Sequence, residues 1–290
     1  MAIKKAANER IITVFAYTIM SFLSVVMLYP LLNVLAISLS DYSEYIANPT
    51  MVFPNHFKLD AYKRILSTNI IVKGYYNTIF VTLVGTLIII SATALFAYPL
   101  AKAKVKLSRF LTFLVIFSML FQAGMIPNYI TIRALGLIDS LWALILCRAI
   151  SPFNFLIMKA NMESISDSLE EAAKIEGAGP LTILTKIVLP LCKPVVVALI
   201  LFYAVAHWNR FFEAILYINS RAKWTMSLIL REIITEDPEA ICEVAEQAAF
   251  VFTKTLQNAV IIITIVPIMM IYPFIQKYFI FGQMLGSVKE

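Results

Sequence analysis

The sequence predicts an all-α, polytopic membrane protein. Of its 290 residues, 60% are hydrophobic and 14% are charged, and the mean hydropathy is +0.82. Soluble domains carry about 25% charged and about 45–50% apolar residues, so this composition argues against a soluble globular fold and against a disordered chain. The apolar residues form long blocks, which indicates helical spans. A membrane barrel would show alternating segments of about ten residues instead.

Six apolar segments are long enough to cross a bilayer, because a spanning helix needs about 20 apolar residues. They are 11–39, 77–101, 109–129, 138–158, 188–217 and 257–281. The first segment follows Lys4, Lys5 and Arg10 and so resembles a signal peptide. Its apolar run is longer than the about 7–15 residues of a signal h-region. We therefore expect an uncleaved first span.

The basic residues of the short loops predict the orientation of these spans. The loop 102–109 holds four basic residues and no acidic one, and such loops stay on the cytoplasmic side. With an even number of spans, both termini are expected in the cytoplasm. The segment 159–187 is then cytoplasmic as well, and the segments 40–76 and 218–256 lie outside.

The first external segment contains a short amphipathic pattern over residues 59–66, which predicts a helix on the membrane surface. The second external segment is longer and mostly acidic after Arg231. Loops of that length usually have a function.

The sequence contains no recognisable motif for catalysis, metal binding or nucleotide binding. The cysteines Cys147, Cys192 and Cys242 form no CxxC pair, so they are expected to be small core residues and not metal or redox groups. There is no GxxxxGK[ST] phosphate loop, no HExxH and no GxSxG. We expect no ATP, cofactor, metal or nucleic acid to bind to this chain, because its positive charge is explained by membrane topology.

The cytoplasmic segment carries a helix–turn–helix pattern. Ser166 or Asp167 can cap a helix N-terminus, and Glu170 and Glu171 follow in the first turn, where the helix dipole favours acidic residues. Gly177 can end this helix in the left-handed conformation. A second helix is expected to start directly afterwards and to run into the fifth span.

The spacing of this segment resembles the EAA loop of ABC-importer permeases. The matching residues are Glu171-Ala172-Ala173, Gly177-Ala178, Ile187, Leu189-Pro190 and Pro194. A plain amphipathic connector would not require this spacing. In that family the loop is the coupling helix, which docks on the ATP-hydrolysing subunit. The resemblance assigns ATPase coupling to Glu170, Glu171, Ala172, Ala173, Glu176, Gly177 and Ala178. Glu171 would contact a basic group of the ATPase, and Glu176 stands where relatives usually carry Asp.

The resemblance extends over nearly the whole chain. Further matching stretches are Asn77-Thr78, Gly124 to Tyr129, Trp208-Asn209 and Tyr272 to Phe279. They are similar to the carbohydrate-importer permeases, specifically the second permease of maltose-type systems in the branch for oligosaccharides and polysaccharide fragments. The resemblance implies the type I ABC-importer permease fold in a bacterial cytoplasmic membrane. It also implies a homologous second permease, two ATPase subunits that hold ATP and Mg, an extracytoplasmic solute-binding protein and a sugar substrate.

Polar residues inside the apolar segments are candidates for the sugar pathway. They are Arg148, His207, Trp208, Asn209 and Arg210. A lone charge at the bilayer centre costs about 2.5–3.5 kcal/mol on insertion scales, so Arg148 either attracts an anionic sugar or pairs with a carboxylate or with backbone carbonyls. Trp208 can stack on a sugar ring or pack in the core, and His207 is most simply a core residue. Arg210 and Glu213 are three residues apart and are expected to pair on one helix face.

The segment after the fifth span supplies the candidate contact with the solute-binding protein, at Trp224, Thr225 and Met226. The alternative is a solvated cap over the bundle. Two other functions stay open at this point. A secondary carrier would need inverted repeats and an acidic residue inside a span. A membrane-embedded glycosyltransferase would need an acidic metal-binding motif, for which Glu236-Asp237 alone is weak.

Overall fold

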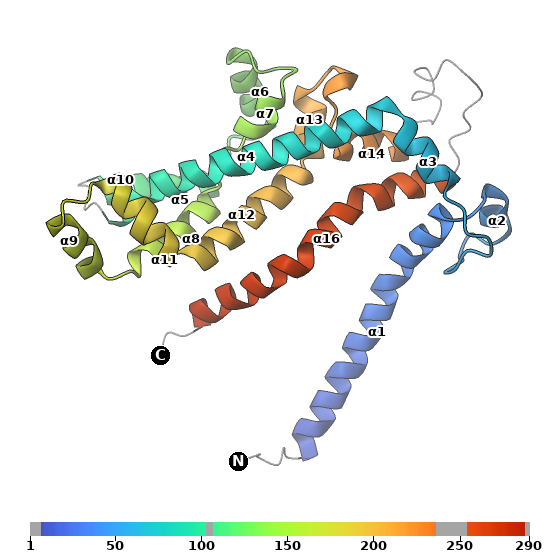
Figure 1. Cartoon of the computed structure of the whole chain (residues 1–290), viewed down its shortest axis with the longest axis horizontal. Coiled ribbons are helices and arrows are strands. Elements are labelled where there is room, and N and C mark those ends of the chain that lie inside the picture. Colours follow the sequence, from blue (N-terminus) through green and yellow to red (C-terminus); the bar gives the residue numbers. More distant parts are fainter. Residues whose placement is uncertain (1–6, 103–106, 236–253, 288–290) are drawn as a thin grey trace. The chain divides into compact units, whose positions relative to one another are not determined.

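The computed structural model describes residues 7–102, 107–235 and 254–287, with side chains placed within 12–102, 107–235 and 254–273. These ranges contain helices and no strand, which confirms the all-α prediction (Figure 1). The chain divides into two compact units. The first comprises Met1–Thr68 and Glu232–Val266, and the second comprises Asn69–Arg231 and Pro267–Glu290.

The first unit begins with a long helix, α1 (Ala7–Ser38), followed by α2 (Tyr42–Ala47) and α3 (Asp60–Ser67). The end of α1 is fixed to the segment behind it: the Ser38 and Tyr62 hydroxyl oxygens are 2.7 Å apart, and the Lys58 backbone N–H donates to the Leu39 carbonyl. The helix predicted over 59–66 is confirmed by α3, and its place on the membrane surface stays a prediction. Most apolar side chains of α1 are exposed within this chain, so they are available to lipid or to another protein.

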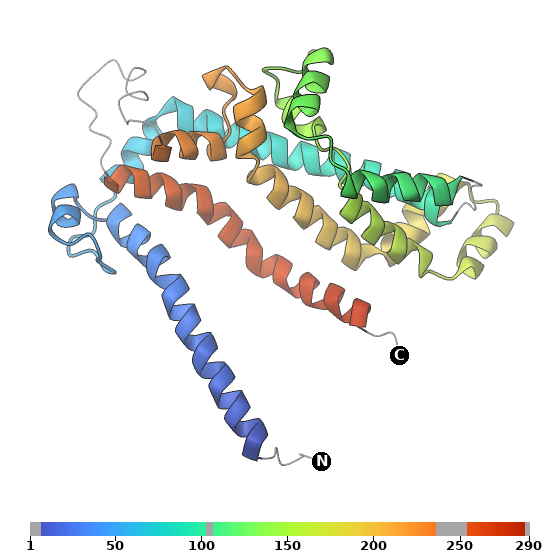
Figure 2. The same ribbon diagram turned by 180° about the vertical axis from the view of Figure 1, so that it is seen from behind.

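The second unit is organised around α4 (Asn69–Ala101). The helices α8 (Pro152–Glu163) and α12 (Lys193–Trp208) pack along it (Figures 1 and 2). Their contact is a fully buried apolar core that includes Ala97, Phe155 and Leu199. Shorter elements lie between and after these helices: α9 (Asp167–Ile175), α10 (Pro180–Ile183), the π-helical turn η1 (Leu184–Val188), α11 (Leu189–Leu191), the 3-10 turn η2 (Arg221–Lys223) and α14 (Met226–Thr235).

Several apolar segments are broken and not continuous. The segment 109–129 is divided between α5 (Ser108–Leu120) and α6 (Met125–Ala134), which meet at an angle of 117°. The segment 138–158 contains α7 (Leu141–Leu146) and the start of α8, and the segment 188–217 ends with α13 (Phe211–Tyr217) after a break at Asn209. The sequence pattern shows how long each apolar block is, but it does not show where the helix inside it stops.

Three helices of the described chain are long and apolar enough to cross a membrane: α1, α4 and α16 (Lys254–Ser287). The number rises to five if two bent pairs each count as one span. These pairs are α5 with α6, and the stretch Pro180–Leu191 with α12, which meet at 88°. The six-span topology stays a prediction.

Helices α4 and α12 are in close contact at Gly85. The His207 ring from α12 is 3% exposed and lies against this glycine. A Cβ atom at position 85 would be 2.8 Å from Nε2 of His207 and 2.9 Å from Cε1. Because an aromatic ring cannot deform, the absence of a side chain at Gly85 permits this packing.

We expect Gly85→Ala to destabilise the protein by about 1–3 kcal/mol, since the added methyl group overpacks a rigid contact. The thermal unfolding midpoint of the purified protein in detergent measures this effect. In a His207→Ala background the same change at position 85 should cost little. Gly179→Ala is the matched control, because nothing lies within 4 Å of a Cβ there. An equal loss in both backgrounds would contradict the contact as the cause.

Candidate functional site

The start of α9 is tied to the end of α4 by a lysine. Lys102 has only 3% of its side chain exposed, and its Nζ lies 2.7 Å from Oδ1 of Asp167. The same ammonium group donates to the Ile165 carbonyl. Ser166 occupies the N-cap position, but its side chain makes no cap hydrogen bond and lies 2.8 Å from the Ser168 hydroxyl oxygen. The tether to α4 therefore fixes the start of α9, and the predicted side-chain cap is wrong for Ser166.

The helix α9 has one buried face and one exposed face. Glu170 and Ala173 point inward, and both are buried. Glu171 and Ala172 are exposed. Three apolar side chains are also exposed beside them on α9 and on α10, namely Leu169, Ile175 and Leu181. Such a patch on a short polar segment is typical of a surface that another protein covers.

The end of α9 is a Schellman turn. Gly177 has φ +84°, its N–H donates to the Lys174 carbonyl at 3.0 Å, and the Ala178 N–H donates to the Ala173 carbonyl at 2.9 Å. Nothing lies within 4 Å of a Cβ at position 177, so glycine is required here for its conformation and not for space. The predicted turn at Gly177 is confirmed, and Glu176 and Gly177 lie at its exposed side.

The chain after this turn joins the main core. Ile183, Leu184 and Val188 are buried in the same apolar cluster as side chains of α4, α8 and α12. Ala173 of α9 belongs to this cluster too. The segment from α9 to η1 is thus a continuous part of the helix packing, so a force on α9 acts directly on those helices.

The loop after α13 is held by two polar residues of α4. The Asn77 side-chain amide donates to the carbonyls of Ala222 and Trp224, at 3.0 and 2.9 Å. The Met226 backbone N–H donates to the Thr78 hydroxyl at 2.8 Å. Met226 is fully buried as a result, whereas Trp224 is partly exposed.

This loop also contains a cation–aromatic contact. The Arg221 guanidinium carbon lies 5.6 Å from the centroid of the Trp224 ring. Arg221 is exposed, and Thr225, like Met226, is buried. Of the three residues predicted to contact a binding protein, Trp224 is the one with surface to offer in this conformation. The contact itself stays a prediction.

The charged residues of the fourth and fifth apolar segments meet at helix breaks. Arg148 lies between α7 and α8, and its Nε is 3.3 Å from Oε1 of Glu213 on α13. Arg210 lies between α12 and α13, is 8% exposed, donates to the Leu144 carbonyl and contacts Sγ of Cys147 at 3.4 Å. The predicted pairing of Arg210 with Glu213 is therefore wrong. The i,i+3 spacing applies within one helix, and the chain at Arg210 is not helical.

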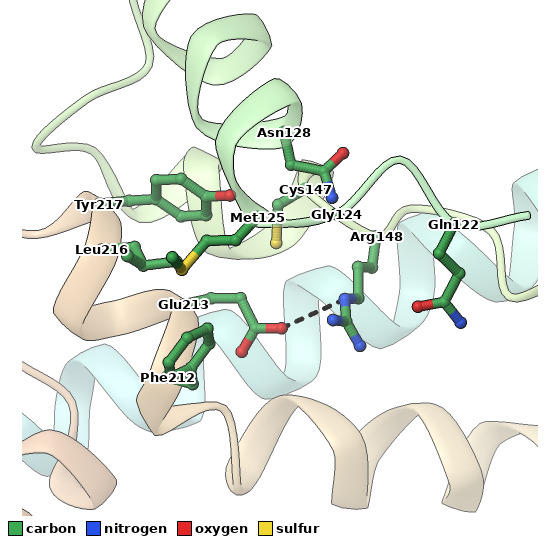
Figure 3. A pocket seen from close by; sticks show the side chains of 10 residues that line it. All are labelled: Gln122, Gly124, Met125, Asn128, Cys147, Arg148, Phe212, Glu213, Leu216 and Tyr217. Atoms are coloured by element: carbon green, nitrogen blue, oxygen red, sulfur yellow. Dashed lines mark ion pairs between the residues drawn. The ribbon is translucent and has the colours of Figure 1, made fainter.

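A cavity of about 180 Å³ opens beside the ion pair of Arg148 and Glu213 (Figure 3). Its walls come from the α5–α6 corner, the α7–α8 break and α13. They are formed by Gln122, Gly124, Met125, Asn128, Cys147, Arg148, Phe212, Glu213, Leu216 and Tyr217. Figure 3 shows the Arg148 guanidinium between the carboxylate of Glu213 and the amide of Gln122.

The other predicted pathway residues lie elsewhere. His207 and Trp208 are buried, and the Trp208 ring makes an edge contact with Tyr75 of α4, with centroids 6.4 Å apart. Asn209 is exposed, and its side chain donates to the Val205 carbonyl. The structure thus separates Arg148 from the cluster at 207–209, and the pathway role of all five residues stays a prediction.

Sequence reasoning missed three features of these sites: the Lys102 tether, the clamp formed by Asn77 and Thr78, and the polar cavity residues Gln122 and Asn128. The position of Lys102 directly after an apolar span was a visible signal, but its partner lies far along the chain. Within the described ranges, no cluster of His, Cys, Asp or Glu could hold a metal. Cys242, Lys104, Lys106 and Glu236-Asp237 lie outside the described residues.

The long apolar helices and the exposed turn at the end of α9 are typical of a helical membrane permease. The family described as binding-protein-dependent transport system inner membrane component matches residues 92–284. The chain is 39% identical to the polygalacturonan/rhamnogalacturonan transport system permease protein YtcP of Bacillus subtilis (strain 168), over 97% of this chain and 99% of the relative. It is 44% identical to Protein LplC of the same organism, over 90% of this chain and 88% of that protein.

A solved structure agrees with these relatives. The crystal structure of a bacterial ABC transporter involved in the import of the acidic polysaccharide alginate contains a chain that matches with a TM-score of 0.86 and 29% identity. The match covers 96% of this chain and 100% of that chain. The protein therefore belongs to the family of binding-protein-dependent inner membrane permeases. It has the type I ABC-importer permease fold, and the predicted resemblance to sugar-importer permeases is confirmed.

We expect Lys102→Met to loosen the start of α9, because Asp167 and the Ile165 carbonyl lose their shared cation. Amide hydrogen exchange over residues 165–176 should become about tenfold faster, as a loss of about 1.4 kcal/mol implies. Lys174→Met is the matched control, since Lys174 is an exposed lysine of α9 itself. Unchanged exchange in Lys102→Met would show that the apolar core alone holds α9.

Proposed function

We propose that this chain is one of the two permease subunits of an ATP-driven importer of acidic oligosaccharides. The observation that carries the substrate class is Arg148, whose side chain is 68% exposed and lines a cavity formed at a break within apolar sequence. The names of two similar proteins support it. One is a polygalacturonan/rhamnogalacturonan permease, and the other belongs to an importer of the acidic polysaccharide alginate.

The cytoplasmic segment is the proposed coupling site. The exposed face of α9, with Glu171, Ala172, Ile175 and the turn at Gly177, docks on a partner ATPase subunit that holds ATP and Mg. Closure of the ATPase pair moves α9. Because α9 shares a core with α4, α8 and α12, these helices move with it and the pathway alternates between outward and inward openings. This chain itself carries out no chemistry.

The remaining partners follow from the topology that the basic loops predict. Both termini and α9 lie in the cytoplasm, so the loop held by Asn77 and Thr78 lies outside. There Trp224 and Arg221 offer a rigid aromatic and cationic surface to the solute-binding protein. Thr225 and Met226 support this surface from within. A homologous second permease completes the pathway.

The test of this function is the ATPase activity of the reconstituted complex, measured with its solute-binding protein and with matched sugars. Uronic oligosaccharides should stimulate ATP hydrolysis, and carboxyl-reduced oligosaccharides of the same length should not. Stimulation by neutral sugars alone would retain the importer and overturn the acidic substrate class.

We expect Gly177→Leu to leave the protein in the membrane and to abolish uptake. A side chain at φ +84° is disfavoured by about 1–2 kcal/mol, so the turn that presents α9 is distorted. Uptake of labelled oligosaccharide by membrane vesicles measures the effect. Gly179→Ala is the control, because Gly179 has an ordinary φ of −74° and open space around it. Full uptake in Gly177→Leu would remove the coupling role from this turn.

We expect Arg148→Met to reduce the transport of acidic oligosaccharides at least tenfold and to leave the transport of neutral ones nearly unchanged. A charge-assisted bond to a carboxylate is lost, and this bond is worth about 1.5–3 kcal/mol. The measurement is competitive uptake of acidic and neutral oligosaccharides by the reconstituted complex. Equal losses for both classes would reduce Arg148 to a structural charge.

A further inference from the structure

The ion pair of Arg148 and Glu213 is unequal in its exposure. Arg148 has 68% of its side chain exposed, whereas Glu213 has 15%. Their contact runs from Nε to Oε1 at 3.3 Å, which is longer than the about 2.7–2.9 Å of a strong charge-assisted hydrogen bond. The guanidinium is thus held loosely from one side and has room for a second partner.

The charges around this pair do not balance. Cys147 lines the cavity beside Arg148 and Glu213, and Arg210 contacts its Sγ at 3.4 Å, so two cations and one anion lie around this residue. Arg210 is buried and bound to the Leu144 carbonyl, so it cannot turn toward a ligand. An excess positive charge inside apolar sequence is unfavourable. An added carboxylate would neutralise it, and the exposed group that can receive this carboxylate is Arg148.

The walls of the cavity suit one sugar unit. Gln122 and Asn128 bring amide groups to the side opposite Glu213 (Figure 3), and amides can both donate to and accept from sugar hydroxyls. A volume of about 180 Å³ is below the about 300–1,000 Å³ of sites that enclose a whole ligand. The cavity therefore accommodates one residue of an oligosaccharide and leaves the remainder to other surfaces.

We infer that this cavity is a subsite for a single uronate residue, in which Glu213 holds Arg148 until the sugar carboxylate replaces it. The inference rests on the proposed function. The guanidinium fork matches a carboxylate in two parallel bonds, whereas Glu213 makes its contact through Nε. The exchange gives Arg148 a partner in both states, so the permease never holds an unpaired guanidinium while the sugar enters or leaves. Glu213 is a positioning residue that sets how tightly an acidic sugar binds.

The experiment measures binding of a tri-uronate oligosaccharide to the assembled complex in detergent without the solute-binding protein, by calorimetry. Glu213→Gln keeps the shape of the side chain and removes its charge. We expect it to bind the acidic sugar about tenfold more tightly than the wild type and the carboxyl-reduced sugar unchanged. The gain should vanish in the double variant Arg148→Met/Glu213→Gln. Glu163→Gln, which removes a carboxylate from the i,i+4 pair with Lys159 on α8, away from the cavity lining, should change nothing.

The outcomes separate the two hypotheses. If acidic sugars stimulate the wild-type ATPase but Glu213→Gln binds them no more tightly, the proposed function stands and the exchange is overturned. If acidic and neutral sugars stimulate the wild-type ATPase equally, the proposed acidic substrate class is overturned, whatever the binding to Glu213→Gln shows. Arg148→Lys is an independent test, because a lysine keeps the positive charge but cannot form two parallel bonds to a carboxylate. It should bind the acidic sugar at least fivefold more weakly, and unaltered binding would overturn the subsite.

Discussion

The hydrogen bond from Arg210 to the Leu144 carbonyl joins two helix breaks, and the architecture around the cavity depends on it. Hydrocarbon offers no partner to free backbone groups, so a helix can stop within apolar sequence only where protein or water satisfies them. The helix α7 ends at Leu146 and α12 ends at Trp208. Arg210, in the break after α12, donates to the carbonyl of Leu144, which lies near the end of α7. Each break therefore stabilises the other.

This solution has a chemical consequence. A buried guanidinium that is occupied by a backbone carbonyl keeps its charge, so the surroundings stay electropositive after Arg148 and Glu213 have paired. In the proposed function, the charge that closes the helix breaks also attracts the acidic sugar, so no separate cluster of basic residues is needed.

The two ends of α4 connect this region to the partners. At its C-terminal end, Lys102 and the surrounding apolar core fix α9, and towards its N-terminal end Asn77 and Thr78 fix the loop that precedes α14. Both segments are therefore attached to the same helix, which contains Pro99 shortly before Lys102. In the proposed mechanism, movement of α9 is the input, and the helix breaks beside the cavity absorb it.

The sequence by itself determined the fold class, the helix α3 and the turn at Gly177. Composition excludes water-soluble alternatives, and turn geometry depends on residues a few positions apart, so these features are readable locally. Only the tertiary structure decided that Arg148 pairs with Glu213, that Arg210 closes a break, and that Lys102 holds α9. Each of these depends on a partner far along the chain. The length of an apolar block limits how many residues can lie within the membrane. Polar groups far along the sequence decide where the helix inside that block ends.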